Sequence, residues 1–170
     1  MSIKIFGAIL VIVGCGGFGF KYAANRLREE RTLRELAATL DYMGCELQYR
    51  LTPLPELCRQ ASEASKGIIS KIFYTLALEL ESQISPDAEQ CMKAVLANIK
   101  DIPKLTLLSF EQLGRSIGRF DVDGQLKGLE AVRQECRRNL EILAKDRDMQ
   151  IRTFQTLGHC AGAAIAILFI

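Results

Sequence analysis

Tryptophan is absent from this chain of 170 residues, histidine occurs once, and aromatic residues make up only 7% of the total. No stretch of useful length alternates apolar and polar residues as a half-buried strand would. Strands favour aromatic and β-branched residues, whereas the 49% hydrophobic content here is rich in Leu, Ile and Ala. We therefore expect an all-α protein with a single soluble domain.

A strong excess of charge of one sign is also missing. The formal net charge is +2 and the isoelectric point is near 8.2. Acidic and basic residues are interleaved at helical spacing, for example along residues 26–35, which is typical of a solvated helix face. Nucleic-acid binding needs basic residues concentrated on one face, so we expect no nucleic-acid partner.

The residues that would build an active site are scarce as well. The only histidine, His159, lies in an apolar segment, where an interfacial or interhelical hydrogen bond is its expected role. No HExxH motif and no nucleophile elbow occur. The sequence from Asp121 to Gly124 resembles the start of a calcium loop, but its glycine is in the fourth position instead of the sixth. We expect no catalytic residue, no cofactor and no metal, so not an enzyme.

The six cysteines form no paired motif. None falls in a CxxC arrangement, and Cys15 and Cys160 lie inside apolar terminal runs. Disulfides are rare in the reducing cytosol. We expect all six to be reduced and mostly buried, which favours a cytosolic location for the middle of the chain.

The two ends of the chain are its long uncharged stretches. Residues 5–20 carry no charge, and the apolar stretch approaches the roughly 20 residues that span a bilayer. Gly14 and Gly17 would allow close approach of another membrane helix. A signal peptide is the alternative, but no clear small-x-small cleavage site follows. We predict a transmembrane helix in residues 1–24.

Residues 154–170 form the second apolar run, which contains no Asp, Glu, Lys or Arg. Gly158 and Gly162 place two small residues on one helix face. The run is short for a span, so a buried hairpin partner or an interfacial helix stays open. We predict a C-terminal transmembrane or membrane-inserted helix there. Basic residues follow the first segment and precede the second, which predicts that the middle domain faces the cytoplasm.

Residues 25–153 are predicted to form a cytoplasmic helical bundle. A leucine-rich stripe repeats at intervals of three and four residues from Leu27 to Leu51, and a second runs from Leu126 to Phe154. Proline and glycine separate the helices between these two, which we expect over about 54–63, 68–80, 88–99 and 106–117. Thr106 could cap the last of these and Gly118 end it, and Asp121 or Asp123 could cap the long helix that follows. The shorter helices should pack on the two long ones as an antiparallel bundle flanked by the membrane helices.

Several short motifs appear in a specific order along the chain: ELQYRLTPLPE from Glu46, LGRSIGRFD from Leu113, then Gln125, and Leu157-Gly158 leading into the terminal apolar run. In this order the chain resembles the stage III sporulation protein AB family over essentially its whole length. The resemblance implies a membrane protein of endospore-forming bacteria, made in the mother cell and placed in the membrane around the engulfed forespore.

The same resemblance implies a non-catalytic role. Family members have a helical soluble domain similar to the cytoplasmic domains of the type II secretion F platform protein. The implied function is a membrane platform or scaffold of a secretion-like channel complex between mother cell and forespore. The implied partners are a cytosolic ATPase, the other membrane components of the stage III complex and membrane lipids, and an oligomer is left open.

Two connecting segments are our candidates for partner contact, because a bundle fixed at both ends can present its loops to a cytosolic protein. The first comprises Thr52, Pro53, Leu54, Pro55 and Glu56, and the second contributes Arg115, Arg119, Asp121 and Gln125. Such turns also occur merely to reverse the chain. The competing functions are a membrane-anchored sensor or regulatory adaptor, and a membrane-bound enzyme. An enzyme would need a convergent polar site, which the sequence does not offer.

Overall fold

The computed structural model describes the backbone of residues 2–82, 87–117 and 122–169, and the side chains of residues 24–82, 87–117, 122–146 and 149. Over these residues the chain is entirely helical, with six α-helices and no strand. The expected all-α class is therefore confirmed.

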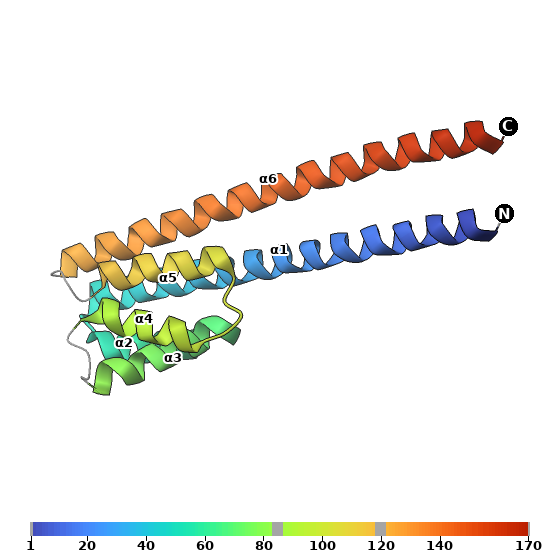
Figure 1. Ribbon diagram of the computed structural model, residues 1–170. Helices are drawn as coiled ribbons and strands as arrows, with labels where there is room; N and C mark the ends of the chain where they lie inside the picture. Colours follow the sequence, from blue (N-terminus) through green and yellow to red (C-terminus); the bar gives the residue numbers. More distant parts are fainter. Residues whose placement is uncertain (1, 83–86, 118–121, 170) are drawn as a thin grey trace.

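Two long helices organise the molecule. α1 (Ser2–Arg50) and α6 (Val122–Phe169) run antiparallel and pack extensively against each other. With a rise of 1.5 Å per residue, each is about 70 Å long. Both continue past the bundle in the same direction, so the two chain termini lie at one end of the molecule (Figure 1). We call the bundle end from which they extend the terminal end, and the opposite end the apex.

Four shorter helices cover one flank of the long pair. They are α2 (Leu54–Ala64), α3 (Gly67–Ser82), α4 (Ala88–Asn98) and α5 (Lys104–Ser116). The chain passes back and forth, so the α2–α3 and α4–α5 connections lie at the terminal end, while the α1–α2 turn lies at the apex (Figure 1). These bounds agree with the helices expected from the sequence to within a few residues.

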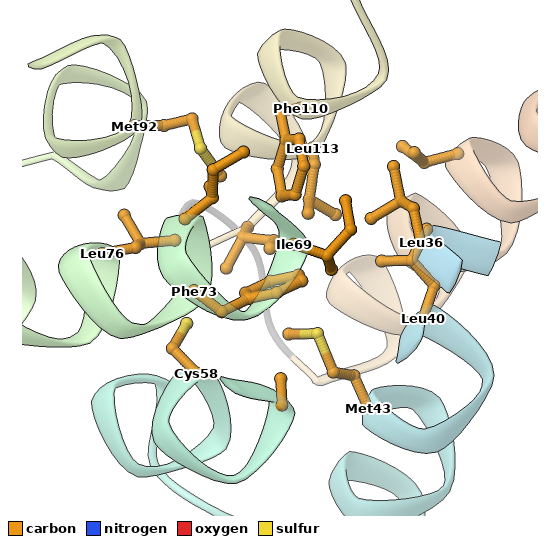
Figure 2. Packing of buried hydrophobic residues seen from close by; sticks show 14 of the residues in the cluster. Leu36, Leu40, Met43, Cys58, Ile69, Phe73, Leu76, Met92, Phe110 and Leu113 are labelled. Carbon is orange, nitrogen blue, oxygen red and sulfur yellow. The ribbon is translucent and has the colours of Figure 1, made fainter. Parts of the chain in front are cut away.

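The core forms where the apolar faces of all six helices meet. Leu36 and Leu40 of α1 face Phe73 of α3 and Phe110 of α5 (Figure 2). The rings of Phe73 and Phe110 meet edge to face with centroids 5.3 Å apart, a favoured aromatic geometry. Because the predicted stripe on α1 supplies residues at helical spacing, its burial also fixes which way the helix faces.

The stripe is shorter at both ends than the sequence suggested. Leu33, Leu40 and Leu47 are buried, but Leu27 is 42% and Leu51 is 64% exposed. The expectation that the apolar face continues to Leu51 was wrong, because α1 ends at Arg50 and the chain changes direction there. Leu51 consequently lies at the apex instead of in the core.

Two helix starts receive their hydrogen bonds from α1 instead of from a local cap. The carboxylate of Glu29 accepts the backbone N–H of Leu105 at 2.8 Å, at the start of α5. The carboxylate of Glu35 accepts the backbone N–H of Lys66 at 2.9 Å, just before α3. These long-range bonds satisfy backbone donors that helix starts leave unpaired, and they tie both terminal-end connections to α1.

The predicted cap at Thr106 was wrong for this reason. α5 begins at Lys104 after Pro103, so Thr106 lies within the first turn. Its side chain is fully buried, and its hydroxyl has no hydrogen-bond partner among the described residues. Asp123 also lies inside the first turn of α6, whereas Gly118 and Asp121 lie outside the described residues.

Two glycines allow neighbouring helices to approach closely. A Cβ at Gly114 would lie 2.8 Å from Cβ of Met92 in α4, and a Cβ at Gly128 would lie 2.5 Å from Cβ of Ser116 in α5. Gly114 belongs to the LGRSIGRFD motif, so this part of the motif has a packing role between α4 and α5. The same α5 then packs against α6 through Gly128.

No helix within the described part of the chain combines the length and apolar character needed to cross a membrane. Apart from Ala24, the predicted membrane segments, residues 1–24 and 154–170, lie outside the residues whose side chains are described. Their backbone belongs to α1 and α6 for most of its length.

Candidate functional site

The apex exposes apolar side chains that the core does not use. Tyr49 is 79%, Leu51 is 64% and Val122 is 37% exposed. Tyr49 lies in the last turn of α1, Leu51 and Pro53 lie in the turn into α2, and Val122 begins α6. Large exposed apolar side chains are common singly, and Tyr74, Leu78 and Leu108 are further examples on this bundle. The position of Tyr49, Leu51 and Val122 at the same end makes the apex a candidate contact surface.

Leu51 adopts a backbone conformation that leucine rarely adopts. Its φ angle is +51°, in the left-handed region, where Gly67 and Asp101 also lie with φ angles of +62°. Glycine and aspartate tolerate this region well. For leucine the left-handed region costs roughly 1–2 kcal/mol. Such strain at an exposed position is a reason to look for a function.

The first predicted contact segment, residues 52–56, lies directly beside Leu51. Pro53 is exposed, and Thr52, Leu54, Pro55 and Glu56 are half-buried. The Leu57 backbone N–H donates to the Pro53 carbonyl at 2.8 Å, which closes the first turn of α2. The prolines therefore have a structural role in starting α2, as well as setting the shape of the apex.

Glu56 is the charged group of this turn, and it has partners within α2. It accepts a hydrogen bond from the side-chain amide of Gln60 at 3.1 Å and lies 3.6 Å from the Arg59 guanidinium. Arg59 also pairs with Glu81 of α3. Glu56 is thus held at the surface with its side chain 47% exposed, where it remains accessible to another protein.

The second predicted contact segment is only partly described. Arg115 is exposed at the end of α5, with its Nε atom 3.8 Å from the carboxylate of Glu89. Gln125 is half-buried in the first turn of α6. Arg119 and Asp121 lie outside the described residues, so the structure does not test their predicted role.

The four glycines predicted to pack membrane helices fall in α1 (Gly14 and Gly17) and α6 (Gly158 and Gly162). Their surroundings lie outside the residues described in atomic detail. That prediction consequently stays a prediction.

A hollow of about 580 Å³ lies between α1 and α6 on the apex side. Its walls include Leu40, Gly44, Cys45 and Gln48 from α1, facing Leu126 and Leu129 from α6. No described atom lies within 4 Å of the position that a Cβ at Gly44 would occupy. The glycine therefore leaves room that the packing of this chain does not fill.

An ionic network crosses the hollow and joins the two long helices. Arg133 of α6 pairs with Asp41 of α1 and also with Glu130, at 2.6 Å, and Arg137 lies 3.3 Å from Asp41. Hydrogen bonds from Arg133 and Gln134 lower the pKa of Glu130. Hydrogen bonds to Glu130 and Asp41 in turn raise the pKa of Arg133. The charged groups are paired with one another, so the network can hold α1 and α6 together or bind a ligand at the hollow.

The described cysteines are free thiols, and three of them are buried. Burial raises the pKa of the Cys58 thiol to about 12, and burial is also the main cause that raises the pKa of Cys136. A thiol is nucleophilic only as the thiolate, so these two act as small hydrophobic residues. Cys45 differs from the expected burial, because it is exposed at the hollow.

Sequence reasoning missed three features of this site. Tyr49 was noticed only as part of a motif, Leu51 was assigned to the core stripe, and Gly44 was not considered. Gly44 could have been found, since a glycine in the middle of a helix costs about 1 kcal/mol relative to alanine and asks for an explanation. The left-handed backbone of Leu51 has no comparable sequence signal.

Comparison with known proteins identifies the family of this chain. The family model described as stage III sporulation protein AB matches residues 4–170. The chain is 22% identical to stage III sporulation protein AB of Bacillus subtilis strain 168 over 171 aligned residues, which cover 99% of each protein. A solved structure described as stage III sporulation protein AB matches with a TM-score of 0.60 and 20% identity, covering 72% of this chain and 98% of that one. At this identity, the structural match supports the helical fold alone.

Proposed function

Because this chain belongs to the stage III sporulation protein AB family and so has a role in sporulation, we propose that it is a non-catalytic membrane platform. In this proposal both ends of the chain are held in the mother-cell membrane around the forespore. The bundle lies in the mother-cell cytoplasm, where its apex engages a cytosolic ATPase. The other membrane components of the complex contact the glycine-bearing ends of α1 and α6.

The observation that carries the proposal is the exposed, strained leucine at the apex. Leu51 exposes 64% of its surface in a conformation that glycine would adopt without strain. It adjoins Tyr49 and the residues of the α1–α2 turn. A partner that buries Leu51 and Tyr49 would explain why an apolar side chain is retained where the fold alone favours glycine.

Membrane attachment is supported by the direction of the two long helices. The apolar residues 5–20 belong to α1, the apolar residues 154–169 belong to α6, and both helices leave the bundle on the same side (Figure 1). A bundle attached there holds its apex about as far from the membrane as its length permits. This is the position in which a cytosolic partner can reach it.

A capture experiment tests the platform role. The full chain, carrying an affinity tag, is purified from sporulating cells in detergent, and co-purified ATPase is quantified. We expect Tyr49→Ala to reduce ATPase capture at least tenfold, because a buried interface aromatic contributes about 2 kcal/mol or more. Tyr74→Ala is the matched control, since Tyr74 is also an exposed tyrosine (55%) but lies on α3.

Leu51→Gly separates contact from folding. Removal of the side chain should weaken capture while the melting temperature stays equal or rises, because glycine relieves the backbone strain. Capture that is unchanged by both apex variants contradicts the apex as the docking surface. Failure to recover any ATPase or membrane component with the unmodified chain contradicts the platform role itself.

A sensor or regulatory adaptor is the second candidate, and the hollow beside Gly44 favours it. Its volume of about 580 Å³ is in the range of small-molecule sites. A ligand there would stabilise the bundle by mass action. A thermal-shift screen of sporulation-phase metabolites distinguishes the two functions, because Gly44→Leu should abolish such a shift without affecting capture of the ATPase.

A further inference from the structure

The two ends of the bundle differ in how their positive charges are matched. Towards the apex and along the bundle, the guanidinium or ammonium groups of seven residues lie within 4.0 Å of a carboxylate: Arg50, Arg59, Lys93, Arg115, Arg133, Arg137 and Arg138. Lys71 and Lys127 are the exceptions within the described part of the chain. At the terminal end the proportion is reversed.

Apart from Arg28, which donates to the Asp101 carbonyl, five exposed cations at the terminal end form no ion pair with any described residue: Arg31, Lys66, Lys100, Lys104 and Lys145. We call these five residues the cationic collar. They come from α1, from the α2–α3 and α4–α5 connections, from the start of α5 and from α6. The long-range bonds of Glu29 and Glu35 hold both connections against α1, so the backbone that carries Lys66, Lys100 and Lys104 has a fixed position beside α1.

Neighbouring carboxylates offset the charge of the collar in part, and Arg34 is paired with Glu30 at 2.7 Å. Glu29 and Glu35 accept backbone N–H groups. Asp146 lies 4.0 Å from Arg26. Glu63 and Asp101 are the remaining exposed carboxylates beside these connections. Together with Arg28, the collar places six cations beside the four carboxylates of Glu29, Glu35, Glu63 and Asp101. The side from which both helices leave the bundle therefore carries a modest net positive charge (Figure 1).

We propose that the cationic collar docks on the anionic headgroups of the membrane from which α1 and α6 emerge. The inference rests on the membrane attachment in the proposed function. A lipid surface fits the chemistry better than an acidic protein does. Four of the five cations are lysines, whose flexible ammonium groups act as point charges. They are also spread over α1, α6 and the two connections on one flank, instead of converging on a single deep pocket. The two small hollows at this end, of about 290 and 210 Å³, are open, and their walls combine Lys104 with Glu29 in one, and Lys66 with Glu35 in the other.

Docking would fix the orientation of the bundle on the membrane. Two continuous helices allow the bundle to tilt, whereas headgroup contacts at α6 and at the connections on the flank of α1 resist this tilting. The α4–α5 loop should respond most clearly, because it carries Lys100 and is held to α1 by the bond from Arg28 to the Asp101 carbonyl at 3.0 Å.

Hydrogen exchange of the full chain in lipid nanodiscs tests the proposal. Amide exchange of residues 99–105 is compared in phosphatidylcholine nanodiscs and in nanodiscs that also contain phosphatidylglycerol. Each lysine close to an anionic surface contributes about fivefold to an equilibrium. We therefore expect exchange up to about 25-fold slower in the anionic nanodiscs at low salt, with the difference shrinking as salt screens the charges.

Two double variants with the same change in charge locate the effect. Lys100→Gln with Lys104→Gln should remove most of the slowing, while Lys93→Gln with Lys127→Gln, away from the collar, should leave it intact. Equal exchange in both lipids, or equal loss in both variants, overturns the collar proposal. Slowing that requires added partner proteins and ignores lipid charge would assign the collar to a protein and overturn it as well.

The same material distinguishes this failure from failure of the proposed function. A chain that stays in membranes during alkaline extraction but shows no lipid-dependent exchange contradicts the collar alone. A chain that alkaline extraction releases contradicts membrane attachment. Its binding to vesicles of the two compositions, measured by sedimentation, then tests the collar directly, and equal binding overturns it.

Discussion

The terminal end and the apex of the same bundle are built on different principles. At the terminal end, α1 carboxylates satisfy backbone groups of the α2–α3 and α4–α5 connections, and the left-handed positions are held by Gly67 and Asp101. At the apex the turn after α1 places Leu51 in the left-handed region and exposes it together with Tyr49. The first end follows the preferences of the isolated fold, while the second departs from them.

The terminal end is stabilised by hydrogen bonds within the chain, whereas the apex carries backbone strain and exposed apolar surface. Residues that satisfy buried backbone groups need no partner to explain them. An exposed apolar side chain on a strained backbone destabilises the isolated chain and is explained by something that covers it. The apex is thus the better candidate for a protein partner, and the cationic collar at the terminal end suits an anionic surface.

The largest expected effect comes from the tight contact of α6 with α5. Gly128→Ala places a Cβ 2.5 Å from Cβ of Ser116, so we expect a loss of about 1–3 kcal/mol in the free energy of unfolding. Gly44→Ala is the control in α1, at the hollow that faces α6, where nothing outside the neighbouring helix backbone lies within 4 Å of the added Cβ. It should raise stability by about 0.5–1 kcal/mol through helix propensity. Denaturant unfolding of both full-length variants measures the difference.

Equal effects of the two substitutions would contradict the difference between the close contact of Gly128 with Ser116 and the open space at Gly44. A loss of stability in Gly44→Ala would mean that the hollow closes in solution. It would also remove the reason to regard that hollow as a binding site.

The tie between Glu29 and α5 should give the next largest effect. Glu29→Ala leaves the Leu105 N–H without its acceptor, which should cost about 1–2 kcal/mol. Glu46→Gln, on the same helix near the apex, keeps the size of the side chain and removes the charge of an i,i+4 pair with Arg50 at 3.4 Å, which should cost about 0.5 kcal/mol or less. Melting temperatures measure both, and similar losses would abolish the distinction between the two ends.

Most of the fold could be predicted from the sequence, because helical periodicity and proline breaks are local signals. The turn at Pro53 and Pro55 and the stripe from Leu33 to Leu47 are examples. The start of α5 could not be predicted, since its acceptor is Glu29, 76 residues earlier in the chain. Thr106 looked like a cap only because no local signal reveals that more distant partner.

The candidate site also has features that the sequence predicts and features that it does not. The α1–α2 turn was predicted as a contact segment from its prolines, and the structure places it at the apex, although its role stays a prediction. The exposure of Leu51 could not be predicted, because its spacing continues the core stripe and only the end of α1 at Arg50 removes it from the core. Gly128, like Gly44, is a helical glycine that asks for an explanation, but the sequence does not tell that one is packed closely against Ser116 and the other faces a hollow.

A gain in stability is expected at the apex. Leu51→Gly relieves a left-handed backbone worth roughly 1–2 kcal/mol, partly offset by the greater freedom of glycine in the unfolded chain. We expect a net gain of about 0.5–1 kcal/mol, measured by denaturant unfolding. Asp101→Gly at the terminal end is the control and should gain less, because aspartate tolerates this conformation. A clear loss of stability in Leu51→Gly would show that its side chain packs on the bundle and would remove the argument from strain.

The smallest effect on stability is expected at Glu56, where docking and folding are easiest to separate. Glu56→Gln removes the charge that faces Arg59 at 3.6 Å, while the side chain can still accept a hydrogen bond from Gln60. An exposed pair of this kind, together with the favourable position of a carboxylate in the first turn of α2, contributes about 0.3–1 kcal/mol. The melting temperature should therefore fall by only a few degrees. Glu63→Gln removes the same charge from the other end of α2 and serves as the control.

If the α1–α2 turn meets a basic surface of the ATPase, Glu56→Gln should reduce capture more than Glu63→Gln does, and the difference should shrink at high salt. Equal capture by the two variants at low salt would restrict docking at the apex to the apolar side chains of Tyr49 and Leu51.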